Sequence, residues 1–438
     1  MQRLLQAVLL CSGLLSPALS ANNLIDVYQL ALQSDPQLMA EAASRRATGE
    51  LKDQARAGFL PEINLSASTN RVWQDTSSQN FGGRRNYNDR GYTLSLVQPL
   101  YRRQNFIFSE QAEIAIEGAD ASFVLAEQTL LVRVAERYFD VLGREDDLTF
   151  SLAEREAIAK QLEQVEQRFE VGLATITDVT EAQAAFDIAN AAVIAAENEL
   201  VNSRELLRET TGVYHELLAS LQDDSPLVSP EPADINQWSE VAITTNPALR
   251  VARSNVNIAR NNIQLQRSGH YPSVDAVARK DYSFQSDSNI SGSTRTNQEL
   301  LGIQFNLPIY AGGAVSSRTR EAGHRLDESM QNEEELRRII MRETRAAFNN
   351  VMSGISRVQA LKQAVVSNEK ALESTEAGFE VGTRTTVDVL NARRELFSAR
   401  RDYAQSRYDY IVNTLRLKQA AGIVTVDDLY QINQWLMQ

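Results

Sequence analysis

The stretch RFEVGLATITDV at residues 168–179 returns as GFEVGTRTTVDV at residues 378–389. Both copies contain Phe-Glu-Val-Gly and then Asp-Val, and the second copy lies 210 positions after the first throughout. A sequence repeat with such a long period is typical of an internally duplicated structure. The stretch therefore predicts that the chain consists of two similar halves.

Further matches keep the same order along both halves, at offsets of 209 to 211 residues. The matching pairs are GFLP at 58–61 with GHYP at 269–272, QPLY at 98–101 with LPIY at 307–310, and RETTG at 208–212 with KQAAG at 418–422. We therefore predict an internal duplication. The predicted segments are a first repeat at 21–212, a linker at 213–235, a second repeat at 236–422 and a C-terminal segment at 423–438.

The first twenty residues, MQRLLQAVLLCSGLLSPALS, have the pattern of a secretory signal peptide at 1–20. Arg3 provides the positive start, an apolar core follows, and small residues precede a predicted cleavage site before Ala21. The single cysteine, Cys11, lies in this segment, so the mature chain is predicted to have no disulfide. The sequence therefore indicates export from the cytoplasm.

The chain is acidic, with a net charge of −13. An acidic surface argues against nucleic acid as a partner, because binding the phosphate backbone needs basic groups. After the signal segment, no stretch approaches the about 18 uninterrupted apolar residues expected of a transmembrane helix. We therefore expect the mature protein either free in a periplasm or in an outer membrane as a β-barrel.

Each half contains two segments in which apolar and polar residues alternate, as in strands that face two environments. These segments are INLSAS (63–68), YTLSLVQP (92–99), VDAVAR (274–279) and LLGIQFNLP (300–308). The polar Gly/Ser/Asn-rich stretches between them, at 74–89 and 286–298, are interpreted as solvated loops. Each half thus predicts a β-hairpin of strands about ten residues long, preceded by helical segments at 24–57 and 236–268.

A long helical region follows the first hairpin. No proline occurs from 103 to 168. The row Ala126, Leu130, Val134, Tyr138 and Leu142 marks the buried face of a helix. A helix of this length would reach roughly 100 Å, which suits a tube across a periplasm better than a globular core.

Apolar and small residues after each copy of the opening stretch follow a strict heptad. They step by three and four from Val179 to Leu207 and again from Val389 to Leu417. A strict seven-residue repeat imposes a left-handed supercoil. The opening stretch is therefore interpreted as the turn of a helical hairpin, one in each half.

The residues of these turns are suited to reversing the chain. Gly172 and Gly382 stand where a reversal uses positive φ. Thr177 or Asp178 in the first copy, and Val387-Asp388 in the second, are expected near the start of the next helix, where an acid suits the helix dipole.

Four strands per chain do not suffice for a membrane barrel, whose smallest versions need about eight. Unpaired edges in lipid would leave backbone groups unsatisfied at several kcal/mol each. If the strands cross a membrane, several chains must therefore share one barrel, and three chains would supply about twelve strands. The alternative is a periplasmic β-hairpin cap in water.

The stretches VGLATITDV at 171–179, VGTRTTVDVLNA at 381–392 and LPIYAGG at 307–313 resemble the TolC family of outer-membrane efflux proteins. The resemblance covers residues 22–438. It implies a mainly α-helical homotrimer, with long coiled-coil hairpins forming a periplasmic α-barrel and a shared twelve-stranded membrane β-barrel. Residues 213–235 and 423–438 would form an equatorial band.

The resemblance also implies a location and partners. The protein is expected in the outer membrane of a Gram-negative cell, in contact with outer-membrane lipid, as a channel-tunnel. It would work with a periplasmic adaptor (membrane fusion) protein and an inner-membrane efflux pump or ABC exporter. The exported cargo would be small toxic molecules or type I secreted proteins, and the sequence does not choose between them.

In the family the hairpin turns form a periplasmic tip that side-chain bonds close at rest. By matching positions, the implied closing network consists of Thr177, Asp178, Arg384, Gln161 and Glu376. The family tyrosine that bonds the aspartate is Phe379 here, which has no hydroxyl group. We therefore expect closure to depend more on Arg384.

The resemblance assigns pore and adaptor residues as well. Of the family's two acidic rings, the first matches Asp388, whereas Asn391 stands at the second position, so we expect weaker cation binding. The implied adaptor contacts are Val171, Gly172, Leu173, Val381, Gly382 and Thr383. Simple helix capping by Asp178 and Asp388 is an alternative role, compatible with the first.

The sequence offers no catalytic constellation, so we predict a protein that is not an enzyme and has no cofactor. The histidines His215, His270 and His324 are far apart and lack a zinc-binding pattern. Two rival hypotheses remain. One is a periplasmic coiled-coil scaffold or adaptor without a pore, and the other is a hydrolase in the equatorial band.

Overall fold

The computed structural model describes residues 22–76, 83–288 and 292–437. The predicted signal peptide lies outside these residues. In the first half the elements are α1 (Leu24–Ser34), α2 (Pro36–Gly49), α3 (Leu51–Ala57), β1 (Glu62–Thr76), β2 (Gly83–Arg102), α4 (Arg103–Glu170) and α5 (Ile176–Thr211). In the second half they are α6 (Ile235–Thr245), α7 (Pro247–Arg267), a 3-10 turn (Ser268–His270), β3 (Ser273–Ser288), β4 (Gly292–Asn306), α8 (Ala314–Glu380), α9 (Thr386–Ala420) and α10 (Val426–Asn433).

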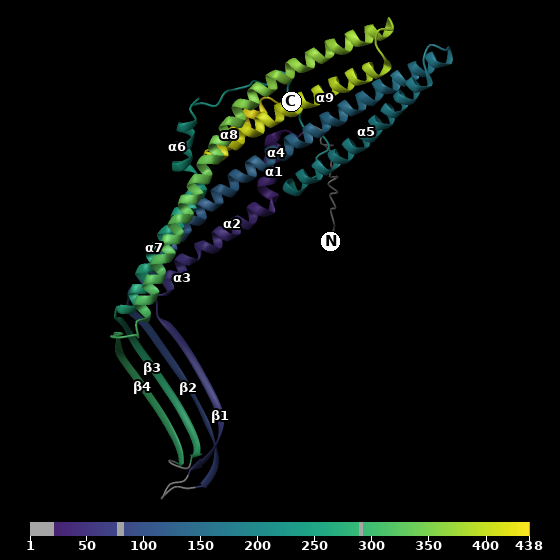
Figure 1. Ribbon diagram of the computed structural model, residues 1–438. Helices are drawn as coiled ribbons and strands as arrows, with labels where there is room; N and C mark the ends of the chain where they lie inside the picture. Colours follow the sequence, from purple (N-terminus) through teal and green to yellow (C-terminus); the bar gives the residue numbers. More distant parts are fainter. Residues whose placement is uncertain (1–21, 77–82, 289–291, 438) are drawn as a thin grey trace, which may run out of the picture. The chain divides into compact units, whose positions relative to one another are not determined.

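The order short helices, two strands, two long helices thus occurs twice (Figure 1). The chain packs into two compact units, each of which takes segments from both halves of the sequence. Unit 1 comprises Met1–Met39, Glu127–Ala242 and Arg342–Gln438, and unit 2 comprises Ala40–Ala126 and Ile243–Met341. Unit 1 contains α1, α5, α9 and α10, unit 2 contains the four strands with α3 and α7, and α4 and α8 contribute to both.

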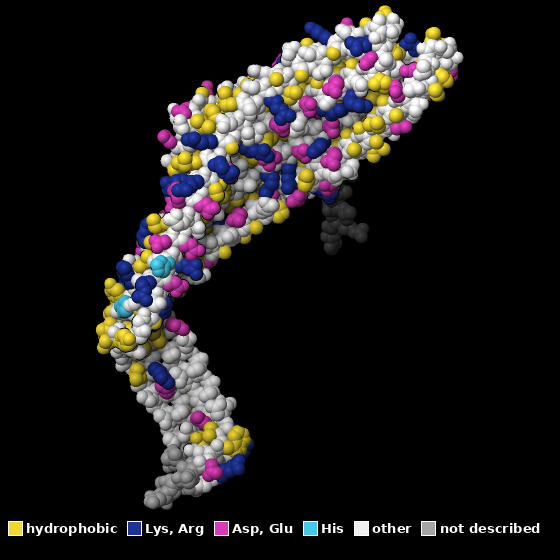
Figure 2. Space-filling view, viewed as in Figure 1, with side chains coloured by type: hydrophobic (Ala, Val, Ile, Leu, Met, Phe, Trp, Pro, Cys, Tyr) yellow, Lys and Arg dark blue, Asp and Glu magenta, His cyan; other side chains and the backbone are white. Residues whose placement is uncertain are grey.

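The long helices follow from uninterrupted helical sequence. α4 has 68 residues and α8 has 67, and neither contains a proline. The predicted apolar row on α4 is confirmed at Leu130, Val134, Tyr138 and Leu142, which are at most 2% exposed, whereas Ala126 is only partly buried. Acidic and basic side chains are interspersed with apolar ones over the face of the helices seen in Figure 2. None of the described helices is both long enough and apolar enough to cross a membrane.

Proline divides the two helical segments that precede the strands. The segment at 24–57 is broken at Asp35-Pro36, and the segment at 236–268 is broken at Asn246-Pro247. Proline lacks the N–H group that would continue the preceding helix but suits the first turn of a new one. Asp35 lies at the first break. Its carboxylate accepts a hydrogen bond from the Leu38 N–H at 2.7 Å and forms an ion pair with Arg133 at 2.7 Å.

The strands form one antiparallel sheet in the order β1-β2-β3-β4. They are 15, 20, 16 and 15 residues long, so the expected length of about ten was too short. The loop interpretation of 74–89 and 286–298 was wrong over most of both stretches, because β1 runs to Thr76, β2 starts at Gly83, β3 runs to Ser288 and β4 starts at Gly292. Residues 77–82 and 289–291 of these stretches lie outside the described residues. Backbone pairing needs only N–H and C=O groups, and polar side chains do not prevent it.

The register gathers apolar side chains on one face of the sheet, which we call the apolar face, although Lys280 and Glu299 also lie on it. Cross-strand partners share a face, so the partner pairs Ile63–Leu96 and Leu65–Leu94 lie on the same side as Leu301, Ile303 and Phe305 of β4. On the opposite face Thr93 Oγ1 donates to Asp281 at 2.6 Å, and Arg279 pairs with the same carboxylate at 2.8 Å. The apolar side chains remain exposed, with Leu301 at 87%.

In unit 1 the predicted linker at 213–235 forms hydrogen bonds with Asn22, the first described residue. The Asn22 N–H donates to the Leu217 carbonyl, and the Ala219 N–H donates to the Asn22 carbonyl. Asn22 Nδ2 donates to Nδ1 of His215 at 2.8 Å, and His215 Nε2 contacts Thr211 Oγ1 at 3.0 Å. His215 is 1% exposed, and burial lowers its pKa. The neutral imidazole suits both contacts, because a protonated Nδ1 would face another donor.

We expect the stability of unit 1 to fall as the pH is lowered below about 6.5. In that range the unfolded chain takes up a proton at position 215 that the folded chain excludes, so acid favours unfolding. The effect is at most about 1.4 kcal/mol per pH unit for one proton. Thermal unfolding between pH 7.5 and 5.5 should be less pH-dependent in His215→Gln than in the wild type. Equal pH dependence in both proteins would contradict this account.

Candidate functional site: the turns of two helical hairpins

The first turn joins α4 to α5 in unit 1, and we call α4–α5 hairpin 1. Gly172 has φ 76°, a conformation that glycine adopts without steric penalty. The Gly172 N–H donates to the Phe169 carbonyl at 2.9 Å, and the Leu173 N–H donates to the Arg168 carbonyl at 2.7 Å. This pair of bonds is the Schellman arrangement, which satisfies the last carbonyl groups of a helix. The predicted role of Gly172 is confirmed.

The second turn joins α8 to α9, which we call hairpin 2, and repeats this geometry. Gly382 has φ 79°, its N–H donates to the Phe379 carbonyl at 3.1 Å, and the Thr383 N–H donates to the Gly378 carbonyl at 2.8 Å. The duplicated sequence thus encodes two copies of one local structure.

The threonine three positions before each aspartate caps the next helix. Thr175 and Thr385 are the N-caps of α5 and α9, and each forms a capping box with Asp178 or Asp388. Asp178 Oδ2 accepts the Thr175 N–H at 2.8 Å, and Asp388 Oδ2 accepts the Thr385 N–H at 2.8 Å. The sequence placed the aspartates near the helix starts, as observed, but it did not single out the capping threonines. The T-x-x-D pattern was the available signal.

These hydrogen bonds keep both aspartates ionised. Bonds from the Thr175 hydroxyl and N–H lower the pKa of Asp178, and bonds from the Thr385 N–H and hydroxyl lower the pKa of Asp388. The caps therefore contribute their stability at pH values above the ordinary aspartate pKa of about 3.9 and lose it as the pH falls below that value. Each turn thus carries a fixed negative charge at neutral pH.

The residues of the implied closing network lie at these turns without bonding one another. Arg384 is exposed and forms no ion pair with a described residue, although its charge contributes to lowering the pKa of Asp388. A Cβ at Gly378 would come within 2.8 Å of Arg384 Cγ, so the missing side chain lets Arg384 lie against the end of α8. Thr177 is exposed in the first turn of α5.

Phe379 has a partner that the sequence did not indicate. The guanidinium of Arg168 lies 4.7 Å from the centre of the Phe379 ring, which is a cation–π contact between α4 and α8. Arg168 occupies the position of copy 1 that corresponds to Gly378 of copy 2. The two hairpins therefore touch at one of the positions at which the two copies differ.

Glu376 is held by Arg393 rather than by Gln161. Arg393 of α9 donates from Nη2 and Nε to Glu376 Oε1 at 2.8 and 3.2 Å, and from Nη1 to the Ala157 carbonyl of α4. Gln161 is 3% exposed, and its Nε2 has no partner among the described residues. One arginine thus joins both helices of hairpin 2 to hairpin 1.

Further contacts hold the hairpins together away from the turns. Arg401 of α9 pairs with Glu154 of α4 at 2.9 Å, and the Tyr408 hydroxyl donates to Asp146 at 2.7 Å. Near the turns a small apolar cluster is formed by Ile158, Ala185, Ala189 and Leu390, with Phe186 packed against it. The two alanines of this cluster leave room for the helices to lie close together.

Both turns present apolar side chains to solvent. The exposed fractions are 70% for Val171, 72% for Leu173, 62% for Ile176 and 76% for Val381. Thr383 is also exposed, and its hydroxyl donates to the Gly378 carbonyl at 3.0 Å. A cluster of exposed apolar groups is typical of an interaction surface. Asn391 is exposed one helical turn after Asp388.

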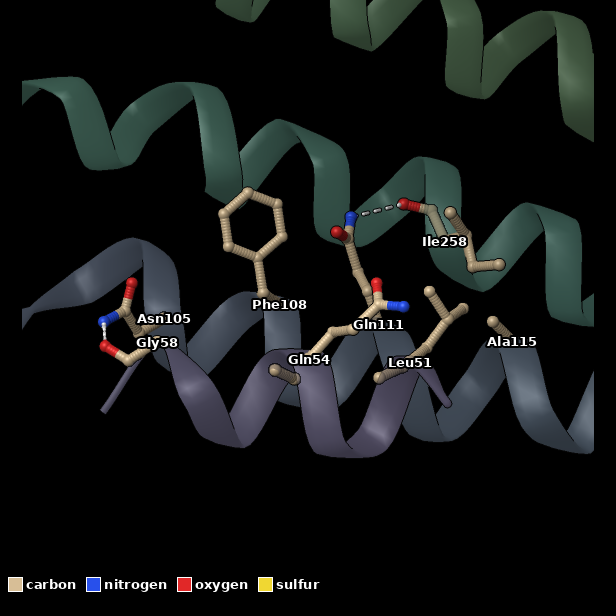
Figure 3. Close-up of a pocket in the computed structure, with 10 residues that line it drawn as sticks. Leu51, Gln54, Gly58, Asn105, Phe108, Gln111, Ala115 and Ile258 are labelled. Atoms are coloured by element: carbon tan, nitrogen blue, oxygen red, sulfur yellow. Dashed lines mark hydrogen bonds between the residues drawn. The ribbon is translucent and has the colours of Figure 1, made fainter. Parts of the chain in front are cut away.

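A separate cavity of about 360 Å³ lies in unit 2 between α3, α4 and α7 (Figure 3). Phe108 faces it, and the Gln111 amide donates to the Ile258 carbonyl at its rim at 3.4 Å. The residues that line it are apolar or uncharged, and none of them has a titratable side chain. Among the described residues, no group of three or more His, Cys, Asp or Glu side chains could hold a metal ion.

Two very long helical hairpins, joined to a small sheet with an apolar face, define the fold of outer-membrane efflux channels. Residues 27–213 and 238–423 match the family model described as outer membrane efflux protein, and the chain belongs to this family. The expected resemblance is thereby confirmed. The protein is an outer-membrane protein with a large periplasmic helical part.

The similarity to individual proteins of this family extends over nearly the whole chain. The chain is 38% identical to outer membrane protein TolC of Vibrio cholerae serotype O1, over 97% of this chain and 96% of that protein. It is 29% identical to alkaline protease secretion protein AprF of Pseudomonas aeruginosa, over 93% and 86%. The crystal structure of the Campylobacter jejuni CmeC outer membrane channel has the same fold, with a TM-score of 0.78 at 16% identity over 95% and 90% of the two chains.

Proposed function

We propose that three copies of this chain form one channel-tunnel that exports cargo across the outer membrane. The observation that carries the proposal is the sheet. Its apolar face is exposed, and its edge strands β1 and β4 have no further strand partner among the described residues. Open edges in lipid cost several kcal/mol for each unpaired backbone group, whereas three sheets of four strands close a twelve-stranded barrel.

The names of two relatives support a proposal for the class of cargo. One relative is named as an outer membrane protein TolC and another as an alkaline protease secretion protein. We therefore propose that this chain passes small toxic molecules, type I secreted proteins or both. An inner-membrane pump or ABC exporter would deliver the cargo through a periplasmic adaptor, and the exposed apolar side chains of the two turns would contact that adaptor.

The tip formed by the two turns is proposed to be the gate. The implied bonds of Arg384 to Thr177 and Asp178 would form between neighbouring hairpins of the trimer, whereas Gln161 is buried and Glu376 is already bonded to Arg393. The observed contacts Arg393–Ala157 and Arg168–Phe379 hold hairpin 2 against hairpin 1 and would favour the closed tip. Three Asp388 carboxylates would form the single acidic ring of the pore, with uncharged Asn391 beside it.

Single-channel recording tests this function. We expect the full-length protein, purified in detergent as a trimer, to give discrete conductance steps in a planar bilayer. Arg384→Ala should increase the mean conductance, because each closing bond at a wet tip contributes only about 0.2–1 kcal/mol and is lost with the guanidinium. Arg338→Ala is the matched control, since Arg338 is exposed and pairs within its own helix with Glu334.

The absence of any channel in both the wild type and Arg384→Ala would overturn the proposal. A water-soluble protein that needs no detergent and forms no trimer would instead support the alternative, a periplasmic coiled-coil scaffold without a pore.

A further inference from the structure

Three arginines without a carboxylate directly opposite them lie on the same face of the sheet as Leu301, near the ends of the strands that are farthest along the chain from the helices. The register aligns Thr69, Arg90, Phe284 and Arg295 in one row across β1 to β4. Arg71 lies opposite Asn88 in the next row, on the same face. We call Arg71, Arg90 and Arg295 the basic row, and all three side chains are exposed.

The basic row stands at the height at which an apolar band of membrane thickness would end. Phe305 and Arg295 share this face of β4 and are ten residues apart, which is about 34 Å of strand. With the tilt of about 40° found in membrane barrels, the two rows are separated by roughly 26 Å along the membrane normal. This height matches the about 25 Å of a membrane-spanning band. The stretch contains the apolar Leu301 and Ile303 and also Asn297 and Glu299, and the charge of Glu299 is paired with Lys280 at 2.7 Å.

Aromatic side chains mark the same boundary. Tyr92 and Tyr282 stack with ring centres 5.3 Å apart in the row next to the basic row, on the apolar side. The guanidinium of Arg90 lies 4.9 Å from the centre of the Phe284 ring, which holds it across the sheet surface. Aromatic girdles flanked by charged groups are typical of a bilayer interface.

The basic row has no acidic partner on its face. Glu299 is paired with Lys280 at 2.7 Å, and Asp89 lies on the opposite face. Asp75 lies farther out, directly opposite Arg84. Within the described ranges, no carboxylate forms an ion pair with Arg71, Arg90 or Arg295, so three positive charges per chain remain exposed.

We propose that the basic row binds the phosphate-bearing headgroups of lipids in the outer leaflet. This inference rests on the proposed function, because it requires the apolar face to meet lipid. A guanidinium group binds phosphate through two parallel hydrogen bonds, and the row places such groups where the apolar band gives way to headgroups. In the trimer the row would repeat around the barrel as nine arginines, three from each chain.

The test compares the binding of two lipids that differ only in their phosphates. Full-length trimer in detergent is mixed with bis-phosphorylated lipid A or with its fully dephosphorylated form, and native mass spectrometry counts the bound lipids. We expect the wild type to bind the phosphorylated lipid at least about tenfold more tightly than the triple variant Arg71→Gln, Arg90→Gln, Arg295→Gln. The dephosphorylated lipid should bind both proteins equally weakly.

The matched control is Arg46→Gln, Arg56→Gln, Arg250→Gln, which removes three exposed arginines from helices of unit 2. It should bind phosphorylated lipid like the wild type. Equal binding by the basic-row variant and the wild type, or equal binding of both lipids by the wild type, would overturn the inference. Conductance of the same variant in a bilayer without phosphorylated glycolipid separates the two proposals, since the channel should persist when the lipid contacts are lost.

Discussion

Replacing Leu173 and Val381 together by glutamate is expected to abolish export while leaving the channel intact. Both side chains are more than 70% exposed at the two turns, so the charged replacements cost the fold little. In the proposed complex they would be buried against the adaptor. Losing two apolar contacts of about 1.5–3 kcal/mol each should weaken that complex at least about a hundredfold.

Two measurements distinguish lost docking from lost folding. Drug susceptibility of cells that depend on this chain should rise to the level of the deletion strain, and co-purification of the adaptor should be lost. Single-channel conductance of the purified trimer should stay near the wild-type value. The control is Leu173→Met with Val381→Ile, which keeps the apolar surface and should export normally. Normal export by the glutamate variant would show that the adaptor binds elsewhere.

The second large effect is expected from Arg393→Ala, which should open the channel. Arg393 is the side chain that ties hairpin 2 to the backbone of hairpin 1, and it is 17% exposed. A hydrogen bond to a charged group contributes about 1.5–3 kcal/mol. If opening separates the hairpins, the open-to-closed ratio should increase by roughly tenfold or more.

Arg400→Ala is the matched control for this prediction. Arg400 also joins α9 to α8, through Glu369 at 2.8 Å, but no contact of Arg400 with hairpin 1 is observed among the described residues. Its removal should therefore leave the mean conductance nearly unchanged. An equal increase in both variants would mean that any loosening of hairpin 2 opens the tip, and no increase in Arg393→Ala would remove Arg393 from the gate.

The turns could be predicted from sequence because their chemistry is local. Gly172 and Gly382 need positive φ, and the heptads after them fix which helix faces are buried, so both features are readable within a few residues. The strand lengths could not be read in the same way. Polar strand residues beyond the apolar segments look like loops, and the pairing partners that keep them extended lie elsewhere in the chain.

The contacts between the two hairpins could not be predicted from the sequence either. Arg168 and Phe379 are 211 positions apart, and nothing local indicates that α4 and α8 meet there. Arg393 and Glu376 lie on opposite sides of a turn, at a spacing that no helical period predicts. The resemblance to the family predicts that Glu376 bonds Gln161. In the structure the Glu376 carboxylate instead pairs with Arg393 of the same hairpin.

The open edges of the sheet have a genetic consequence. β1 and β4 each lack a further neighbour among the described strands of the chain, so in the proposed trimer a closed barrel would need two intact edge strands from every chain. In a cell that makes wild-type and edge-defective chains in equal amounts, roughly one trimer in eight would be wholly wild type. Mutations in these two strands should therefore act as dominant alleles, whereas mutations that prevent export of the chain from the cytoplasm should be recessive.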